Sequence, residues 1–298
     1  MRIETLDLGF QGTPQVIASY LLEGPVGNVL VETGPGSTLP ALLTGLDRLG
    51  LAPGDVGDVL VSHIHLDHAG AAGWWAQQGA RVHVHPRGAP HLIDPSKLLA
   101  SAGRIYGDRM ETLWGEVLPA PAERVVAVED GATLEVGGLR IEAYDTPGHA
   151  RHHLVYALEE VVFTGDAAGI QLPGNGWSDL PAPPPEFDLE QWLRTLERIR
   201  DLGARTLYRT HFGPSGDIDT ELSHFAEVLA EVTRWVREMR QDGLDREAMI
   251  DDFTARIRRL AAKTGLDSRQ LEAYEIVNPR AMSVDGIARY LNHLDGDR

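Results

Sequence analysis

Up to about residue 218, the chain alternates short apolar runs with segments of helical periodicity. Runs of about four to eight residues that are rich in valine, leucine and isoleucine are typical of buried strands. Such runs predict strands at 3–8, 16–23, 28–33, 58–61, 81–85, 124–128, 139–144, 154–158, 161–164 and 205–210. Segment 37–49 carries its leucines on one helical face, and segment 188–202 is a second helix with Asp188 as its N-cap.

Two regions differ from this alternation. Between residues 86 and 121 the pattern is irregular and partly helical, and we expect this segment to form a cap. From Asp219 onward the pattern is helical only. Because the pattern changes there from alternating strands and helices to helices alone, we expect an α/β domain over residues 1–218 and a C-terminal helical extension over 219–298.

The segment Ser62–His68 carries three histidines and one aspartate, namely His63, His65, Asp67 and His68. It follows the predicted strand at 58–61 and precedes a predicted helix start at 69–75, so we expect a loop. Neutral imidazole and carboxylate are the groups that hold zinc and similar divalent ions. Their density therefore indicates a metal site on this loop.

Three further ligand candidates occupy equivalent places. His149, Asp166 and His211 each come at the end of a predicted strand or directly after it. Ligands at the carboxyl ends of core strands can converge on one point, which ligands scattered over helices would not do. The sequence thus predicts a single centre with seven candidate ligands: His63, His65, Asp67, His68, His149, Asp166 and His211.

Composition excludes several classes of function. The chain has no cysteine, so cysteine nucleophiles and cysteine metal ligands are excluded. Its formal charge of −17 argues against a nucleic-acid partner, which would require a basic face. No stretch of the sequence is long and apolar enough to span a membrane, and we expect a cytoplasmic protein without a membrane partner.

The motifs together resemble one family. The order His63-x-His65-x-Asp67-His68, Gly148-His149, Gly165-Asp166 and Thr210-His211 is similar to that of the metallo-β-lactamase superfamily. Segment 28–34 is similar to the part of that family that usually carries an aspartate, here replaced by Glu32. The resemblance covers roughly residues 15–215, and it implies a four-layer αββα sandwich, followed here by the helical extension.

The resemblance also implies two divalent metal ions, with zinc the first choice and manganese or iron as alternatives. It implies that His63, His65 and His149 hold one ion, that Asp67, His68 and His211 hold the other, and that Asp166 bridges them. A hydroxide between two such ions is a nucleophile at neutral pH. Asp67 and Asp166 are therefore candidate catalytic residues as well as ligands. His152 or His153 is a candidate for assisting departure of the leaving group, and His153 is our first choice.

An aspartate rather than a cysteine at position 166 favours the glyoxalase-II-like and lactonase-like branches of the family. The expected function is metal-dependent hydrolysis of an ester, thioester or lactone in a small-molecule substrate. A phosphodiesterase or phosphotriesterase, or a sulfur dioxygenase with one iron ion, is the alternative. The sequence after Asp166 lacks the tyrosine of acyl-homoserine lactonases, since residues 167–170 are Ala-Ala-Gly-Ile. The C-terminal helices either cover the sandwich or form the contact of a homodimer.

Overall fold

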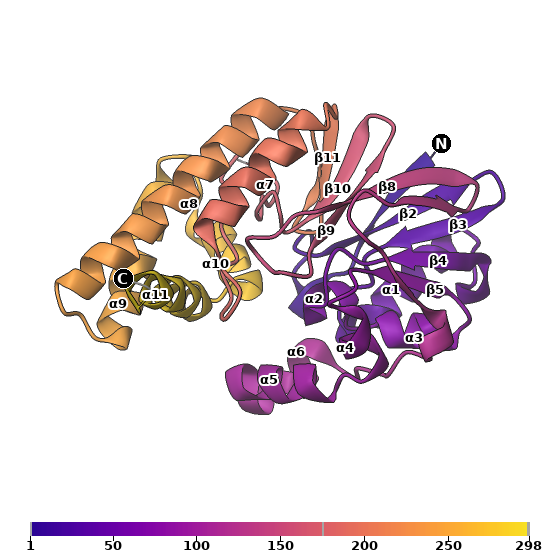
Figure 1. Ribbon diagram of the computed structural model, residues 1–298, viewed down its shortest axis with the longest axis horizontal. Coiled ribbons are helices and arrows are strands. Elements are labelled where there is room, and N and C mark those ends of the chain that lie inside the picture. Colours follow the sequence, from indigo (N-terminus) through magenta and orange to yellow (C-terminus); the bar gives the residue numbers. More distant parts are fainter. Residues whose placement is uncertain (1, 175, 297–298) are drawn as a thin grey trace.

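The computed structural model describes residues 2–174 and 176–296 and contains two six-stranded sheets that pack face to face (Figure 1). The first sheet has the order β1-β2-β3-β4-β5-β6, with β1 Arg2–Asp7, β2 Ala18–Gly24, β3 Gly27–Val31, β4 Val56–Leu60, β5 Arg81–Val84 and β6 Val125–Ala127. The second has the order β12-β11-β10-β9-β8-β7, with β7 Thr133–Val136, β8 Leu139–Asp145, β9 Leu154–Leu158, β10 Val161–Gly165, β11 Thr206–Arg209 and β12 Gly213–Ser215.

Strand direction decides where the predicted ligands meet. In the first sheet β3 and β4 are parallel, so both carboxyl ends lie at the same edge. In the second sheet β8 and β10 are each antiparallel to β9, and β11 is parallel to β10. Strands β8, β10 and β11 therefore run in one direction, and their carboxyl ends also share one edge. The ligand-bearing segments leave the two sheets from these edges.

The space between the sheets is filled by alternate side chains of both inner faces. Tyr20, Val29 and Leu60 come from the first sheet, and Tyr156 and Phe163 from the second. The hydroxyl group of Tyr156 donates to the backbone oxygen of Val61 at 3.0 Å, and so joins the sheets close to the motif loop. An apolar core with few, satisfied polar contacts gives the edge a rigid base.

Helices cover both outer faces, which confirms the αββα architecture (Figure 1). Helices α1 (Leu39–Arg48) and α3 (Ala72–Gln77) pack on the first sheet. Helix α7 (Leu189–Asp201) lies over the second sheet and packs against α8 (Ile218–Gln241). Asp188 caps α7 as predicted, because its side chain accepts the backbone N–H of Gln191 at 3.0 Å.

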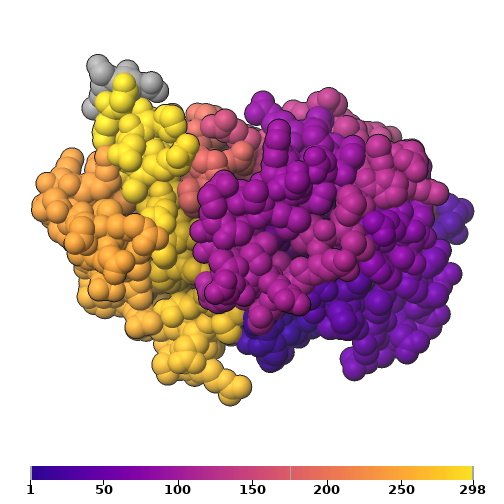
Figure 2. All heavy atoms as spheres, turned by 90° about the horizontal axis from the view of Figure 1, so that it is seen from below, coloured from indigo at the N-terminus to yellow at the C-terminus, as the bar shows by residue number. Residues whose placement is uncertain are grey.

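The segment between β5 and β6 forms three helices, α4 (Ala89–Ile93), α5 (Ser96–Tyr106) and α6 (Met110–Trp114). The predicted helical extension is present and continues after α8 as α9 (Arg246–Ala262), α10 (Ser268–Val277) and α11 (Arg280–Gly296). In Figure 2 the magenta cap segment lies directly beside the yellow C-terminal helices. Their contact includes the hydroxyl group of Tyr106 and the sulfur atom of Met282, 3.7 Å apart.

Three details differ from the sequence analysis. Strands β7 and β12 were not predicted, because both are short edge strands and β12 contains Pro214, which only an edge strand tolerates. The prediction of a loop for the segment Ser62–His68 was also wrong in part, since Leu66–Ala69 form one helical turn, α2, before α3 begins.

Within the described part of the chain, every helix is too short or too polar to cross a membrane.

Candidate metal centre

All seven predicted ligands lie together at the shared edge of the two sheets. His63 and His65 are in the segment that follows β4, and Asp67 and His68 are on the helical turn α2. The other three follow strands of the second sheet, His149 after β8, Asp166 after β10 and His211 after β11. Their ligand atoms form overlapping groups of three residues, and within each group the ligand atoms lie within 4.8 Å of one another.

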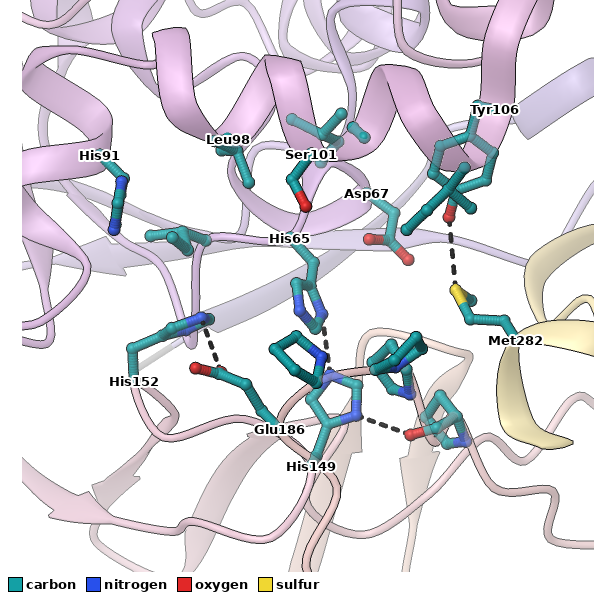
Figure 3. Close-up of a pocket in the computed structure, with 18 of the residues that line it drawn as sticks. His65, Asp67, His91, Leu98, Ser101, Tyr106, His149, His152, Glu186 and Met282 are labelled. Carbon is teal, nitrogen blue, oxygen red and sulfur yellow. Dashed lines mark hydrogen bonds and ion pairs between the residues drawn. The ribbon is translucent and has the colours of Figure 1, made fainter. Parts of the chain in front are cut away.

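The first group is formed by His63, His65 and His149, and Figure 3 shows two of them, His65 and His149, with nitrogens that face one another. His63 Nε2 lies 2.8 Å from His65 Nδ1 and 3.1 Å from His149 Nε2. The distance from His149 Nε2 to His65 Nδ1 is 2.9 Å. Three nitrogens at such spacing suit a tetrahedral cation, which would take two Nε2 atoms and one Nδ1 atom as ligands.

The second group joins Asp67, His68 and His211, with Asp166 between the two groups. His211 Nε2 lies 3.3 Å from Asp67 Oδ2. Asp166 directs Oδ2 toward His149 Nε2 at 3.3 Å, and Oδ1 toward His68 Nε2 at 3.3 Å. One carboxylate thus divides its two oxygens between the groups, which is the arrangement a bridging ligand needs.

Backbone carbonyls fix the tautomer of two ligand rings. His149 Nδ1 is 2.8 Å from the carbonyl oxygen of Pro181, and His211 Nδ1 is 2.7 Å from that of Val16. A carbonyl oxygen only accepts, so both Nδ1 atoms carry the proton. In the neutral rings the inward Nε2 atoms then present lone pairs, as metal-binding histidines do.

Glu32 supports a third ring from behind. Its carboxylate lies 3.4 Å from His68 Nδ1, and it accepts the hydroxyl group of Thr210 at 3.3 Å. Glu32 is buried and has a φ of 62°, in the left-handed region that non-glycine residues rarely adopt. Glu32 stands where the resembled family usually has an aspartate. Its carboxylate contacts His68 from behind and does not belong to the groups of inward-facing ligand atoms.

The charges within the cluster shift the pKa values in opposite directions. Burial lowers the pKa of His68, but Asp166, Asp67 and Glu32 outweigh it and raise this pKa well above the ordinary value. Burial raises the pKa of Asp67, but His68 and His211 outweigh it and lower it to about 2. The pKa of Asp166 lies well below its usual range, because the effect of burial is exceeded by that of His68, His149 and His211. The carboxylates are therefore ionised at neutral pH.

Two buried atoms of the cluster further indicate that its side chains suit divalent ions. His68 Nε2 and Asp166 Oδ1 are buried and have no hydrogen-bond partner among the described residues. The two atoms face one another as an ion pair at 3.3 Å without hydrogen-bond geometry, and incompletely satisfied buried polar atoms are costly in a metal-free site. A cation between the two groups would satisfy both atoms, and imidazole with carboxylate is the chemistry that zinc, manganese and iron accept.

A cavity of about 270 Å³ opens over the ligands (Figure 3). Its floor includes His65, Asp67, His149 and Asp166. Helix α5 supplies one wall, prolines of the segment 181–185 supply another, and Met282 of α11 closes a third side. Most of these wall side chains are apolar. Among the described lining residues outside the centre, only Lys97 and Glu186 carry fixed charge.

The structure separates the two histidines that the sequence could not. His152 lines the cavity, and its Nε2 lies 3.2 Å from Glu186 Oε2. His153 lies behind the ligands, with Nδ1 2.8 Å from Thr146 Oγ1 and Nε2 accepting the backbone N–H of Asp166 at 3.2 Å. The geometry therefore favours His152 for contact with a molecule in the cavity, whereas His153, our first choice from the sequence, contacts the backbone of Asp166.

Other histidines, an arginine and aromatic residues near the centre mostly have structural roles. His83 and His85 contact Asp58 and Asp145 at 2.8 and 3.0 Å, so they form no further metal site together. Arg209 is paired with Glu221 at 3.0 Å. Among the aromatic residues of this region, Trp75 is in the core, while Tyr106 and Trp114 line the cavity. Pro181 and Glu186 were missed, since neither residue type signals a site without its tertiary neighbours.

Comparison with known proteins gives one family. A family model described as "Metallo-beta-lactamase superfamily" matches residues 12–211. A metallo-beta-lactamase fold-containing protein of Sulfurisphaera tokodaii is 28% identical, over 67% of this chain and 74% of its own length. An atrochrysone carboxyl ACP thioesterase of Aspergillus fumigatus is also 28% identical, over 65% of this chain, but the match spans only 50% of that relative.

The solved structures agree with the sequence comparison. A metallo-beta-lactamase family protein of Thermus thermophilus aligns over 99% of this chain and 93% of its own, with a TM-score of 0.68 and 25% identity. Because the alignment extends over nearly the whole chain, the likeness includes the C-terminal helices as well as the sandwich.

Metal affinity is predicted to rise with pH. In the metal-free protein the raised pKa of His68 keeps this ring protonated at neutral pH, and a metal ion must displace that proton. We expect the apparent affinity to increase above pH 6.5, by about tenfold per pH unit for each displaced proton, until the pH passes the raised pKa. Chelator competition at several pH values measures this.

Glu32→Gln provides the matched variant for this prediction. It removes one carboxylate that raises the pKa of His68, so the steep part of the affinity curve should move to lower pH. Metal affinity that is flat with pH in the wild-type protein, with no proton release on binding, would contradict the prediction.

Proposed function

The chain belongs to the metallo-beta-lactamase superfamily, and we propose that it is a hydrolase of a small-molecule ester, thioester or lactone that uses two divalent metal ions. The observation that carries the proposal is the division of the Asp166 oxygens between two ligand groups at the floor of an apolar cavity. We assign His63, His65 and His149 to one ion, and Asp67, His68 and His211 to the other. Divalent ions held there would lower the pKa of a coordinated water and polarise the substrate carbonyl.

The cavity supports an acyl substrate over a phosphoryl one. The two proposed divalent ions could serve either reaction at the reacting group, so the choice rests on the cavity wall that would contact the rest of the substrate. Among the described residues that line the cavity, Lys97 is the only lysine or arginine, whereas Asp67 and Glu186 are acidic. Side chains such as Leu98, Ile105 and Met282 instead offer apolar contact to an acyl chain.

A thioester is the first choice among acyl bonds. The relative from Aspergillus fumigatus is named as a thioesterase that acts on an acyl carrier protein substrate, and half of its length matches this chain. The mostly apolar cavity wall suits an uncharged acyl group, and a thioester has a neutral, activated carbonyl group. The proposal is for an acyl group carried on a small thiol.

The proposed function is tested with a substrate panel. Thioesters, esters, lactones and phosphodiesters are offered to protein reconstituted with zinc, manganese or iron. We expect hydrolysis of acyl thioesters or esters with an aliphatic acyl group, and loss of activity on chelation. Turnover of phosphodiesters alone would favour the phosphodiesterase alternative, and one iron per chain with oxygen uptake would favour a sulfur dioxygenase. Failure of every class with every metal would end the hydrolase proposal.

His152 is predicted to take part in turnover without holding metal. Burial lowers its pKa to about 4, against the opposing effect of Glu186, so its ring is neutral at physiological pH, and its Nε2–H, which faces Glu186, is available to donate to the leaving group. His152→Ala should lower kcat by about a hundredfold, in the range of lost acid–base assistance, with unchanged metal content. His91→Ala, at another lining position, is the control. A normal kcat in His152→Ala together with a low one in metal-replete His153→Ala would return the role to His153.

The wall of α5 is predicted to set the length of the acyl group. Ser101 lines the cavity, and Ala100 is its exposed neighbour outside the lining. Ser101→Trp should fill the cavity and raise KM for long acyl chains by about tenfold or more, while short acyl chains still reach the centre. Ala100→Trp is the matched control and should behave as wild type. Equal KM changes for short and long chains in Ser101→Trp would speak against this wall as the acyl site.

A further inference from the structure

The C-terminal helices reach the metal centre through a buried polar network. Where α10 passes into α11, Asn278 and Arg280 meet the fully buried carboxylate of Asp179. Arg280 Nη1 forms an ion pair with Asp179 Oδ2, and Asn278 Nδ2 donates to the same oxygen at 3.0 Å. Asn278 Nδ2 also donates to the backbone oxygen of Leu180 at 2.7 Å. These contacts fasten the segment 177–185 to the helices.

The first turns of α11 extend this attachment. The hydroxyl group of Ser283 donates to the backbone oxygen of Leu180 at 3.1 Å. Its oxygen accepts the backbone N–H of Ala182 at 3.4 Å. Gly286 lies so close to the segment that a β-carbon there would overlap the carbonyl oxygen of Ala182. A glycine inside a helix costs stability, and here it permits helix backbone and loop backbone to touch.

The attached segment has two functions in the site. The carbonyl oxygen of Pro181 accepts His149 Nδ1–H at 2.8 Å and so directs Nε2 to the other ligands. The rings of Pro181, Pro183 and Pro184 form a wall of the cavity. The same segment also pairs with the residues after the bridging ligand, because Asp179 and Ile170 form a β-bridge, with the N–H of Ile170 donating at 3.0 Å.

Stability alone does not account for this network. Replacement of a buried ion pair by apolar residues of similar volume is often neutral or stabilising. Here Arg280 is almost fully buried, yet its Nε and Nη2 atoms have no partner among the described residues. What the pair does provide is one fixed position for the backbone of residues 179–182.

We propose that the start of the last helix, with Asn278, Arg280, Ser283 and Gly286, is a positioning element for the metal centre. It sets the Pro181 carbonyl, and through it the orientation of His149. This rests on the proposed metal centre but not on any particular substrate. The residues concerned touch neither the substrate nor the metal, so they act on the centre only through the segment 177–185.

The test compares two glycines of the same helix. Gly286→Ala forces the Ala182 backbone away from α11, whereas Gly296→Ala adds a methyl group in open space. Cobalt is titrated into the metal-free proteins against a chelator, and the visible spectrum of the bound ion is recorded. We expect Gly286→Ala to bind cobalt about 10–100-fold more weakly, with an altered spectrum, since loss of the group that orients a ligand has effects of this size. Gly296→Ala should match the wild type.

A second pair of variants keeps the test decisive if Gly286→Ala does not fold. Ser283→Ala removes only the hydroxyl group, and Ser268→Ala, at the exposed start of α10, is its control. Weaker cobalt binding in Ser283→Ala, with the fold retained, supports the proposal. Wild-type affinity and spectrum in Ser283→Ala and in any folded Gly286→Ala overturn it, although the proposed function stands. A wild-type protein that binds no metal removes both.

Discussion

The structure depends on one electrostatic constraint, the burial of several ionisable groups where the two sheets meet. The imidazoles of His63, His68, His149 and His211 and the carboxylate of Asp166 are buried there, next to the partly buried side chains of His65 and Asp67. Ionisable groups are costly to bury unless they are paired. Within the cluster the pairing is incomplete, because His68 Nε2 and Asp166 Oδ1 form an ion pair at 3.3 Å but have no hydrogen-bond partner among the described residues. Only a rigid scaffold can hold such groups in place until a cation satisfies them, and the close-packed layer between the sheets provides it.

The constraint explains why support for the ligands comes from distant parts of the chain. The carbonyl oxygen of Val16 holds His211, the carboxylate of Glu32 holds His68, and the carbonyl oxygen of Pro181 holds His149. Each ring must be fixed from behind to present one nitrogen forward. Since a single loop could not surround the cluster, the N-terminal segment, a strand end and the proline-rich segment each contribute one partner.

Sequence patterns brought these seven side chains together because each follows the end of a strand or lies in the segment after one. Buried strands have a strong apolar signal, and a histidine or aspartate directly after one stands out, as at His149 and Asp166. The pattern failed for β7 and β12, whose edge positions demand little apolar character. It also failed to rank His152 against His153. His152 and His153 are adjacent residues of one type whose side chains lie on opposite sides of the backbone. Their places are marked by contacts with Glu186, which is far away in the sequence, and with Thr146, whose residue type indicates no site.

The substrate wall and the metal centre are less separable than their places in the sequence suggest. Helices α5 and α11 meet across the cavity through Tyr106 and Met282, and no residue of either helix belongs to the ligand groups found in the described part of the chain. Pro181 joins the two roles, because its ring lines the cavity while its carbonyl oxygen orients His149. A change in the proline-rich wall that widens the cavity would therefore also move a ligand. Variation in substrate size is accordingly easier on the α5 side, where the wall can change without a hydrogen bond to the centre.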